Sequence, residues 1–239
     1  MADWLYSFIA AGIQAFIWGG ELAREENLPE QGPAVLVANH LGALGPLASA
    51  ACVPRRLYPW VVAEMVDANT ASNYLRLDFV EKELHLRLPF SLWLAKALSK
   101  ITVPLLNSVG CVAVYPDADG LRTTFERSLD LLLDGQFLLV FPEDPSRPIY
   151  PQFKMSPFKK GFARLGEMYF QHTGQILRFY PLAIHGERRL VQVGKPIAYN
   201  PYTSPVEERM RVKNVLENMI HEMYLEMDAG GYVGVPLPY

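Results

Sequence analysis

The chain has 239 residues, half of them hydrophobic, with 22 Lys and Arg against 25 Asp and Glu. Its length and composition allow one sizeable hydrophobic core. The net charge of -3 gives no electrostatic reason to expect nucleic acid as a partner. The two cysteines, Cys52 and Cys111, lie in apolar stretches and are too few for a disulfide framework, which favours an intracellular protein without a metal site.

Residues 1–28 are expected to form an apolar helix that associates with a membrane. Residues 4–20 contain no charged side chain, and this length is close to the ~17 residues that can cross a bilayer. In a helix, Ser7, Gln14 and Glu21 lie on one narrow polar stripe, and the aromatic residues at both ends suit a water–lipid interface. The alternative is a terminal helix packed on the protein's own core or on a second subunit.

Residues 29–239 are expected to form a single α/β domain with a mixed, largely parallel sheet flanked by helices. Short apolar runs alternate with helical patterns along this stretch, which is typical of that class. The runs are rich in Val, Leu, Ile and aromatic residues, and they predict strands at 34–38, 57–63, 111–115, 137–141, 179–184 and 190–197.

Three helices are predicted from apolar residues at three- and four-residue spacing. The second has a serine cap and a proline in its first turn, and the third begins with a Ser-Pro-Val-Glu capping box. The methionine stripe of the third helix is assigned to the core or to a subunit contact. The predicted helices are 121–133, ended by Asp134-Gly135; a helix opening at Ser156-Pro157 and ended by Gly174; and a helix opening at Ser204 and ended by Gly230-Gly231.

The segment 66–107 is strongly apolar and has few charges. It predicts either a helix pair that covers the site or a second surface in contact with a membrane. The sequence leaves both interpretations open.

A polar pair, Asn39-His40, ends the apolar run at 34–38 and is followed by a glycine-rich turn. The ends of parallel strands are where α/β folds place their ligands. A histidine titrates near neutral pH and can take a proton from a hydroxyl group, so His40 is a candidate general base. The alternative is a solvated histidine, or one whose hydrogen bonds are satisfied in the core.

The run at 137–141 likewise opens into a polar loop, which carries Glu143, Asp144 and Arg147. Further on, Lys159 and Lys160 are expected in the first turn of the second helix. Cations there oppose the helix dipole, so they indicate an anionic partner. A solvated charged face is the alternative interpretation.

The order of these segments resembles that of the glycerophospholipid (lysophosphatidate) acyltransferase family over roughly residues 30–200. Each segment alone is common, and the specificity lies in their order and spacing. The segments are Asn39-His40, Leu132-Leu133-Asp134-Gly135, Phe141-Pro142-Glu143, Phe158-Lys159-Lys160-Gly161, Tyr180-Pro181-Leu182-Ala183-Ile184 and Val193-Gly194-Lys195-Pro196-Ile197.

The resemblance implies a glycerol-phosphate-acyltransferase-like fold and transfer of a fatty acyl group from a thioester to a glycerol-type hydroxyl. It implies no bound cofactor, with acyl-CoA or an acyl-carrier-protein thioester as co-substrate. Expected partners are a phospholipid or lysophospholipid, the cytoplasmic surface of the cell membrane and an acyl carrier protein. The implied catalytic residues are His40, Glu143 and Asp144, and the implied substrate-binding residues are Asn39, Phe141, Pro142, Arg147, Lys159 and Lys160.

The chain also departs from the family's motifs. The family pattern is N-H-x-x-x-x-D, and Gly45 stands where the aspartate that orients the histidine is expected. The second motif's arginine is missing near Pro116, and the loop 144–146 replaces glycine-threonine-arginine. Neutralising the orienting aspartate of a serine-protease triad costs about ten-thousand-fold in turnover. The alternative function is therefore a catalytically impaired protein of the same fold that binds lipid or an acyl chain.

Overall fold

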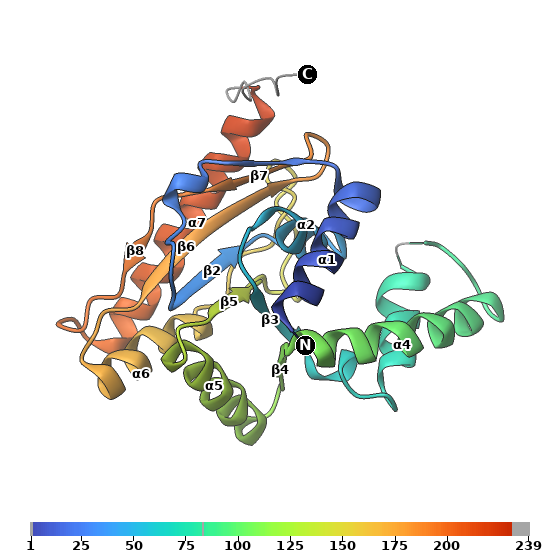
Figure 1. Cartoon of the computed structure of the whole chain (residues 1–239), viewed down its shortest axis with the longest axis horizontal. Helices are drawn as coiled ribbons and strands as arrows, with labels where there is room; N and C mark the ends of the chain where they lie inside the picture. The colour runs from blue at the N-terminus through green and yellow to red at the C-terminus, as the bar shows by residue number, and fades with distance from the viewer. Residues whose placement is uncertain (1, 83, 231–239) are drawn as a thin grey trace. The chain divides into compact units, whose positions relative to one another are not determined.

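The computed structural model describes residues 2–82 and 84–230 (Figure 1). The chain falls into two compact units, one formed by residues 58–127 and the other by residues 2–57 with 128–230. The larger unit contains a mixed sheet flanked by helices, as expected for a largely parallel α/β fold. It is also the unit that carries the predicted site residues.

The central strand of the larger unit is β2 (Ala34–Ala38), all five residues of which are buried. It pairs in parallel with β5 (Phe137–Val140) on one side and β6 (Arg178–His185) on the other. An unbroken apolar run of this kind is typical of a strand covered on both faces. Beyond β6 lie β7 (Leu190–Val193), which is antiparallel to β6, and β1 (Glu21–Ala23), which is parallel to β7. The short β8 (Ile197–Ala198) also pairs with β6.

Helices cover both faces of this sheet. On one face, Leu36, Leu139 and Leu182 belong to a buried cluster together with Ala48 of α2 (Leu44–Cys52). The alternate residues point to the opposite face, where Phe179 meets the ring of Phe162 at 5.9 Å. Helix α7 (Pro205–Asp228) packs along β6, as Figure 1 shows. The sheet is therefore the middle layer of the unit.

The N-terminal segment is helical, as α1 (Asp3–Ile13) followed by a π-helical turn at Gln14–Trp18. Helix α1 packs against α2, yet Trp4, Phe8 and Phe16 are 73%, 73% and 90% exposed. Among residues 2–82 and 84–230, no helix combines the length and hydropathy that a membrane crossing requires. Membrane association of residues 1–28 stays a prediction.

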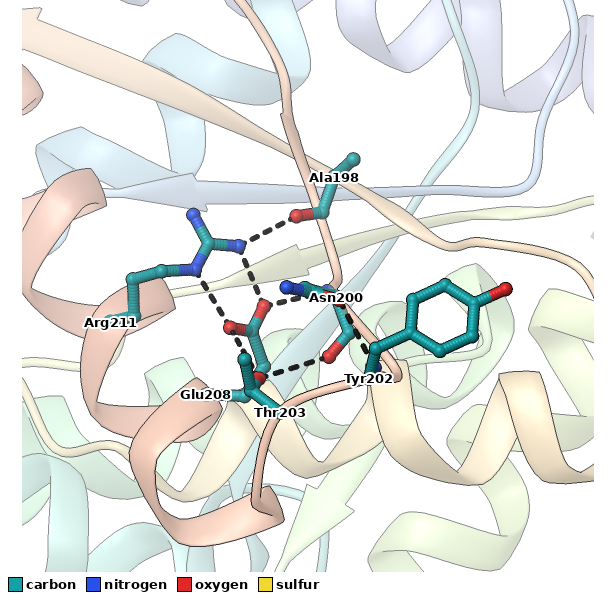
Figure 2. Close-up of polar contacts among 6 residues, drawn as sticks. All are labelled: Ala198, Asn200, Tyr202, Thr203, Glu208 and Arg211. Carbon is teal, nitrogen blue, oxygen red and sulfur yellow. Dashed lines mark hydrogen bonds and ion pairs between the residues drawn. The ribbon is translucent and has the colours of Figure 1, made fainter.

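The N-terminus of α7 is fixed by a polar cluster around Glu208, which is 1% exposed (Figure 2). The Glu208 carboxylate accepts hydrogen bonds from the Asn200 amide at 2.7 Å and from the Arg211 guanidinium at 2.6 and 2.7 Å. Arg211 also donates to the Ala198 carbonyl at 2.8 Å, which ties the helix to β8. The predicted cap is confirmed, because the Ser204 hydroxyl accepts from the Glu207 amide.

Most predicted elements are confirmed, with α5 (Ala118–Leu133) ending before Gly135 at a φ of 72°. Four details differ. Strand β1 was not predicted, and the run 190–197 divides into β7 and β8 around Gly194. Met210 belongs to the methionine stripe that was assigned to the core or to a subunit contact, and it lies outside the core at 41% exposure. The second helix, α6 (Arg164–Thr173), begins eight residues after Ser156. The predicted stop at Gly231 lies outside the described residues.

The smaller unit contains most of β3 (Leu57–Val62), which pairs in parallel with β4 (Val112–Val114). Between these strands the chain forms α3 (Ala71–Leu75), a π-helical turn at Arg76–Val80 and the long helix α4 (Phe90–Val109). Leu75, Val80 and Ala95 form its buried cluster. The apolar segment 66–107 is thus mostly helical in the part that the structure describes, and the choice between the two interpretations stays a prediction.

Candidate active site at the ends of strands β2 and β5

Strands β2 and β5 are parallel neighbours in register, with Val37 opposite Val140. Their carboxyl ends therefore lie at the same edge of the sheet, and each opens into a polar segment. There the Glu143 Oε1 atom accepts a hydrogen bond from the His40 backbone amide at 2.6 Å. The structure brings together the two segments that the sequence proposed, 103 residues apart in the chain.

Glu143 holds three segments together. Its Oε2 atom accepts from the Ser156 amide at 2.8 Å, and its backbone forms an antiparallel bridge with Phe158. Burial raises the pKa of the Glu143 carboxyl, the amides of His40 and Ser156 oppose this rise, and the nearby Glu217 carboxylate adds to it. Glu143 thus acts on the main chain of His40 and fixes where that residue leaves β2.

The His40 side chain is exposed, and its ring makes a T-shaped contact with the Phe141 ring at a centroid distance of 5.0 Å and an interplanar angle of 76°. The backbone then turns through left-handed conformations at Leu41 (φ 42°) and Gly42 (φ 59°) before α2 begins. Leu41 lacks the conformational freedom of glycine at such an angle, so the turn carries local strain. The turn directs the chain from His40 straight into α2.

The structure explains why glycine occupies position 45, where the resemblance implies an aspartate. A Cβ atom at this position would lie 2.1 Å from the His40 carbonyl oxygen and 2.8 Å from its carbonyl carbon. These contacts are with backbone, which cannot rotate away as a flexible side chain can. The backbones of residues 40 and 45 approach this closely because position 45 has no side chain.

Asn39 is fully buried and joins β2 to β6. Its side-chain nitrogen donates to the Ile184 carbonyl at 2.9 Å, and its side-chain oxygen accepts from the Ile184 amide at 2.7 Å. This pair of bonds continues the strand pairing one residue beyond Ala38. The side-chain amide of Asn39 is therefore engaged by protein, and a substrate contact stays a prediction.

Asp144 points its carboxylate into its own loop. Its Oδ1 atom accepts from the Ser146 amide at 3.1 Å and from the Ser146 hydroxyl at 2.7 Å, and it lies 3.4 Å from the Lys159 ammonium. The hydrogen bonds from Ser146, followed by the charge of Lys159, hold the pKa of this half-buried carboxyl below its usual range. Asp144 is thus an organiser of the loop and carries a charge at neutral pH.

The remaining predicted residues flank this loop. Pro142 is buried, and its carbonyl accepts from the Lys159 amide at 2.8 Å. Arg147 and Lys160 have exposed side chains, and the Arg147 carbonyl accepts from the Ser156 hydroxyl at 3.3 Å. Of the three predicted cations, Arg147 belongs to this loop, Lys159 bonds to it through its amide and lies beside Asp144, and Lys160 follows Lys159 in the chain.

The prediction that Lys159 and Lys160 lie in the first turn of a helix is wrong. The amides of Ser156 and Phe158 donate to the carboxylates of Glu143 and Glu217, so the chain there runs alongside the Glu143 loop. A 3-10 turn at Gly161–Ala163 follows before α6 begins. The helix-dipole reason for an anion at these lysines is therefore withdrawn, although their charge remains.

Two residues near this sheet edge were not predicted. Glu217 of α7 pairs with Lys213 one helical turn away and accepts from the Phe158 amide at 3.1 Å. The contact with Phe158 is long-range, and the sequence has no local signal for it. His185 ends β6, where it is buried, stacks on Tyr224 at 4.5 Å and lies 3.4 Å from Asp228. The rule that selected His40, a polar residue at the end of a parallel strand, would also have selected His185.

Two surface hollows belong to the smaller unit. One, of about 670 Å³, is lined by Glu81 and residues 85–88. The other, of about 520 Å³, is lined by Glu64, Tyr74, Asp78 and their neighbours. Neither contains a residue from the predicted site.

The fold of this chain is similar to that of a solved acyltransferase. A solved structure that it resembles is the 1-acyl-sn-glycerophosphate (LPA) acyltransferase PlsC from Thermotoga maritima, with a TM-score of 0.56. The match covers 95% of this chain and 83% of that chain at 15% sequence identity, so it concerns the fold alone. No family model matches the chain. No curated protein matches its sequence either.

Proposed function

We propose that the protein is an acyltransferase that moves a fatty acyl group from an acyl thioester to a glycerol-type hydroxyl of a lysophospholipid. The observation that carries the proposal is the hydrogen bond between Glu143 and the His40 amide, at the shared edge of β2 and β5. It supports the proposal because it presents an exposed histidine at a sheet edge in a fold that resembles an acyltransferase. His40 is the proposed general base.

In the proposed reaction, the acceptor oxygen attacks the thioester carbonyl carbon while its proton passes to the His40 ring. The tetrahedral intermediate collapses, the carbon–sulfur bond breaks and the departing thiolate takes the proton back. No covalent enzyme intermediate is required. Glu143 serves as a positioning residue because it binds the His40 main chain, and it does not need to exchange a proton.

The proposed acceptor site is lined by the cations Arg147, Lys159 and Lys160, which would bind the phosphate of a lysophospholipid. Phe141 and Pro142 would supply apolar contacts beside the reacting carbonyl. The donor is acyl-CoA or an acyl-carrier-protein thioester, and no bound cofactor is proposed. We place the reaction at the cytoplasmic surface of a membrane, where the lipid acceptor is found.

The test is transfer of a radiolabelled acyl group from acyl-CoA to lysophosphatidate by the purified protein. His40→Ala is expected to lower the rate by about 10²- to 10⁴-fold, the usual contribution of a general base. The matched control is His172→Ala, which changes an exposed histidine on α6 and should leave the rate unchanged. Equal rates for the wild type and His40→Ala would reject the assignment.

A second function, non-catalytic binding of a lipid or acyl chain, is favoured by Gly45. Because a Cβ atom at this position would lie 2.1 Å from the His40 carbonyl oxygen, the backbone leaves no room for an orienting aspartate there. Restoring the family residue with Gly45→Asp is for the same reason a poor test, since it would displace His40. The measurement that distinguishes the two functions is consumption of the thioester donor in a single turnover. If lipid co-purifies and stays bound while the thioester is never cleaved, the protein is a binding protein.

A further inference from the structure

Helix α4 in the smaller unit exposes several of its large apolar residues, whereas Val103 is buried and Leu94 and Leu98 pack on the buried cluster. Phe90, Trp93 and Ile101 are 71%, 73% and 69% exposed. The buried positions of the same helix include Ser91 and Ser99. In a helix whose only neighbours are the protein core and water, burial of apolar area drives the opposite arrangement. The outer face of α4 is therefore suited to an apolar environment.

The exposed apolar residues form one continuous surface. Positions 90, 93, 97, 101 and 104 are three or four residues apart, so they lie along one side of the helix. In the segment just before the helix, Leu86 and Leu88 are also 38% and 61% exposed, and they line the hollow of about 670 Å³. Small residues on the opposite side, such as Ala95, let α4 pack closely against α3.

The charged side chains of the segment 84–116 all have one sign, whereas Glu81, which lines the hollow beside Leu86 and Leu88, is paired with Arg76. The sequence contains no Asp or Glu from Leu84 to Pro116, although the whole chain has a net charge of -3. Arg87, Lys96 and Lys100 are exposed, and the two lysines lie four residues apart along one edge of the apolar stripe. An apolar face bordered by cations, with tryptophan among the exposed residues, is complementary to the boundary between headgroups and acyl chains of an anionic bilayer.

We propose that this α4 surface, formed by Leu88, Phe90, Trp93 and Ile101 with Arg87, Lys96 and Lys100, binds the surface of a bilayer that contains anionic lipid. The apolar residues enter the interface and the cations bind lipid headgroups. Docking by this surface does not depend on acyl transfer, so it is measured on the full-length protein without a substrate.

The experiment is co-sedimentation with vesicles of phosphatidylcholine alone and of phosphatidylcholine with phosphatidylglycerol at 7:3. Lys96→Gln with Lys100→Gln should weaken binding to the anionic vesicles by roughly 30-fold, about fivefold for each lysine near the surface. The matched control is Arg178→Gln with Lys195→Gln, which removes two exposed cations of the larger unit and should bind as the wild type does. Raising the salt from 0.1 to 1 M should weaken wild-type binding, because screening shortens from about 10 Å to about 3 Å.

A triple variant, Phe90→Ser, Trp93→Ser and Ile101→Ser, tests the apolar part and should lower vesicle binding by roughly 100-fold or more. Because these three side chains are exposed, the triple variant should fold as the wild type does, and an unchanged melting temperature verifies this. Wild-type binding by the triple variant would overturn the proposal. The proposal would also be overturned if the wild type were a dimer that does not bind vesicles and the triple variant were a monomer. The surface would then be a subunit contact. A third overturning result is complete loss of binding in Trp4→Ser with Phe8→Ser while the α4 variants still bind.

Discussion

Replacing Gly45 with alanine tests whether the close approach of β2 and α2 fixes the position of His40. The added Cβ atom would lie 2.1 Å from the His40 carbonyl oxygen. Non-bonded heavy atoms are stable at about 3.5–4.0 Å, so the two backbones must separate by about 1 Å or more. Overpacking of this kind costs about 1–3 kcal/mol. For a chain of this size, 2 kcal/mol corresponds to a melting temperature about 4–8 °C lower.

The same displacement should reach the site. A misplacement of about 1 Å lowers the rate of a reaction that depends on orientation by about 100-fold. Acyl transfer by Gly45→Ala should therefore fall by this factor at saturating substrate, provided that the wild type is active. The matched control is Gly12→Ala, because no atom lies within 4 Å of a Cβ atom there and alanine is favoured in a helix.

Thermal melts followed by circular dichroism measure the two glycine variants side by side. The expected result is a lower melting temperature for Gly45→Ala and an equal or higher one for Gly12→Ala. A Gly45→Ala protein that melts within about 1 °C of the wild type would refute the packing argument. It would also make the aspartate of the family motif sterically admissible at this position.

Three further changes test the contacts around the site and at the start of α7. Asn39→Leu leaves the buried amide and carbonyl of Ile184 without hydrogen-bond partners, which costs about 1–3 kcal/mol for each group. The midpoint of urea unfolding should therefore fall clearly, and an unchanged midpoint would contradict the prediction. Burial raises the folded-state pKa of Glu143, so the stability of the wild type relative to Glu143→Gln should be greatest below the ordinary glutamate pKa and should decline as the pH rises through the raised pKa. Urea titrations from pH 4 to 7 measure this difference in stability, and a difference that stays constant with pH would contradict the prediction. Glu208→Ala removes charge-assisted bonds to Arg211 and should cost about 2–3 kcal/mol in thermal melts, whereas a loss below about 0.5 kcal/mol would show that the cluster is dispensable.

The sequence alone determined the elements whose signals are local. The run at 34–38 has no polar residue, which is typical of a strand buried on both faces, and β2 is such a strand. The Ser204 cap and the turn at Gly135 depend on neighbouring residues, and both occur where predicted. His40 was predicted as a candidate base in the same way, and its place just after β2 is confirmed, whereas its role stays a prediction.

Contacts between distant residues were decided by the tertiary structure alone. Nothing near Ser156 indicates that its amide binds Glu143, and the chain there follows the Glu143 loop although serine and proline favour a helix start. Gly45 could be read only as a missing aspartate until the His40 carbonyl was found against it. Local sequence sets the preference of each segment, but buried hydrogen-bonding groups and close backbone contacts are satisfied by partners that only the folded chain brings near.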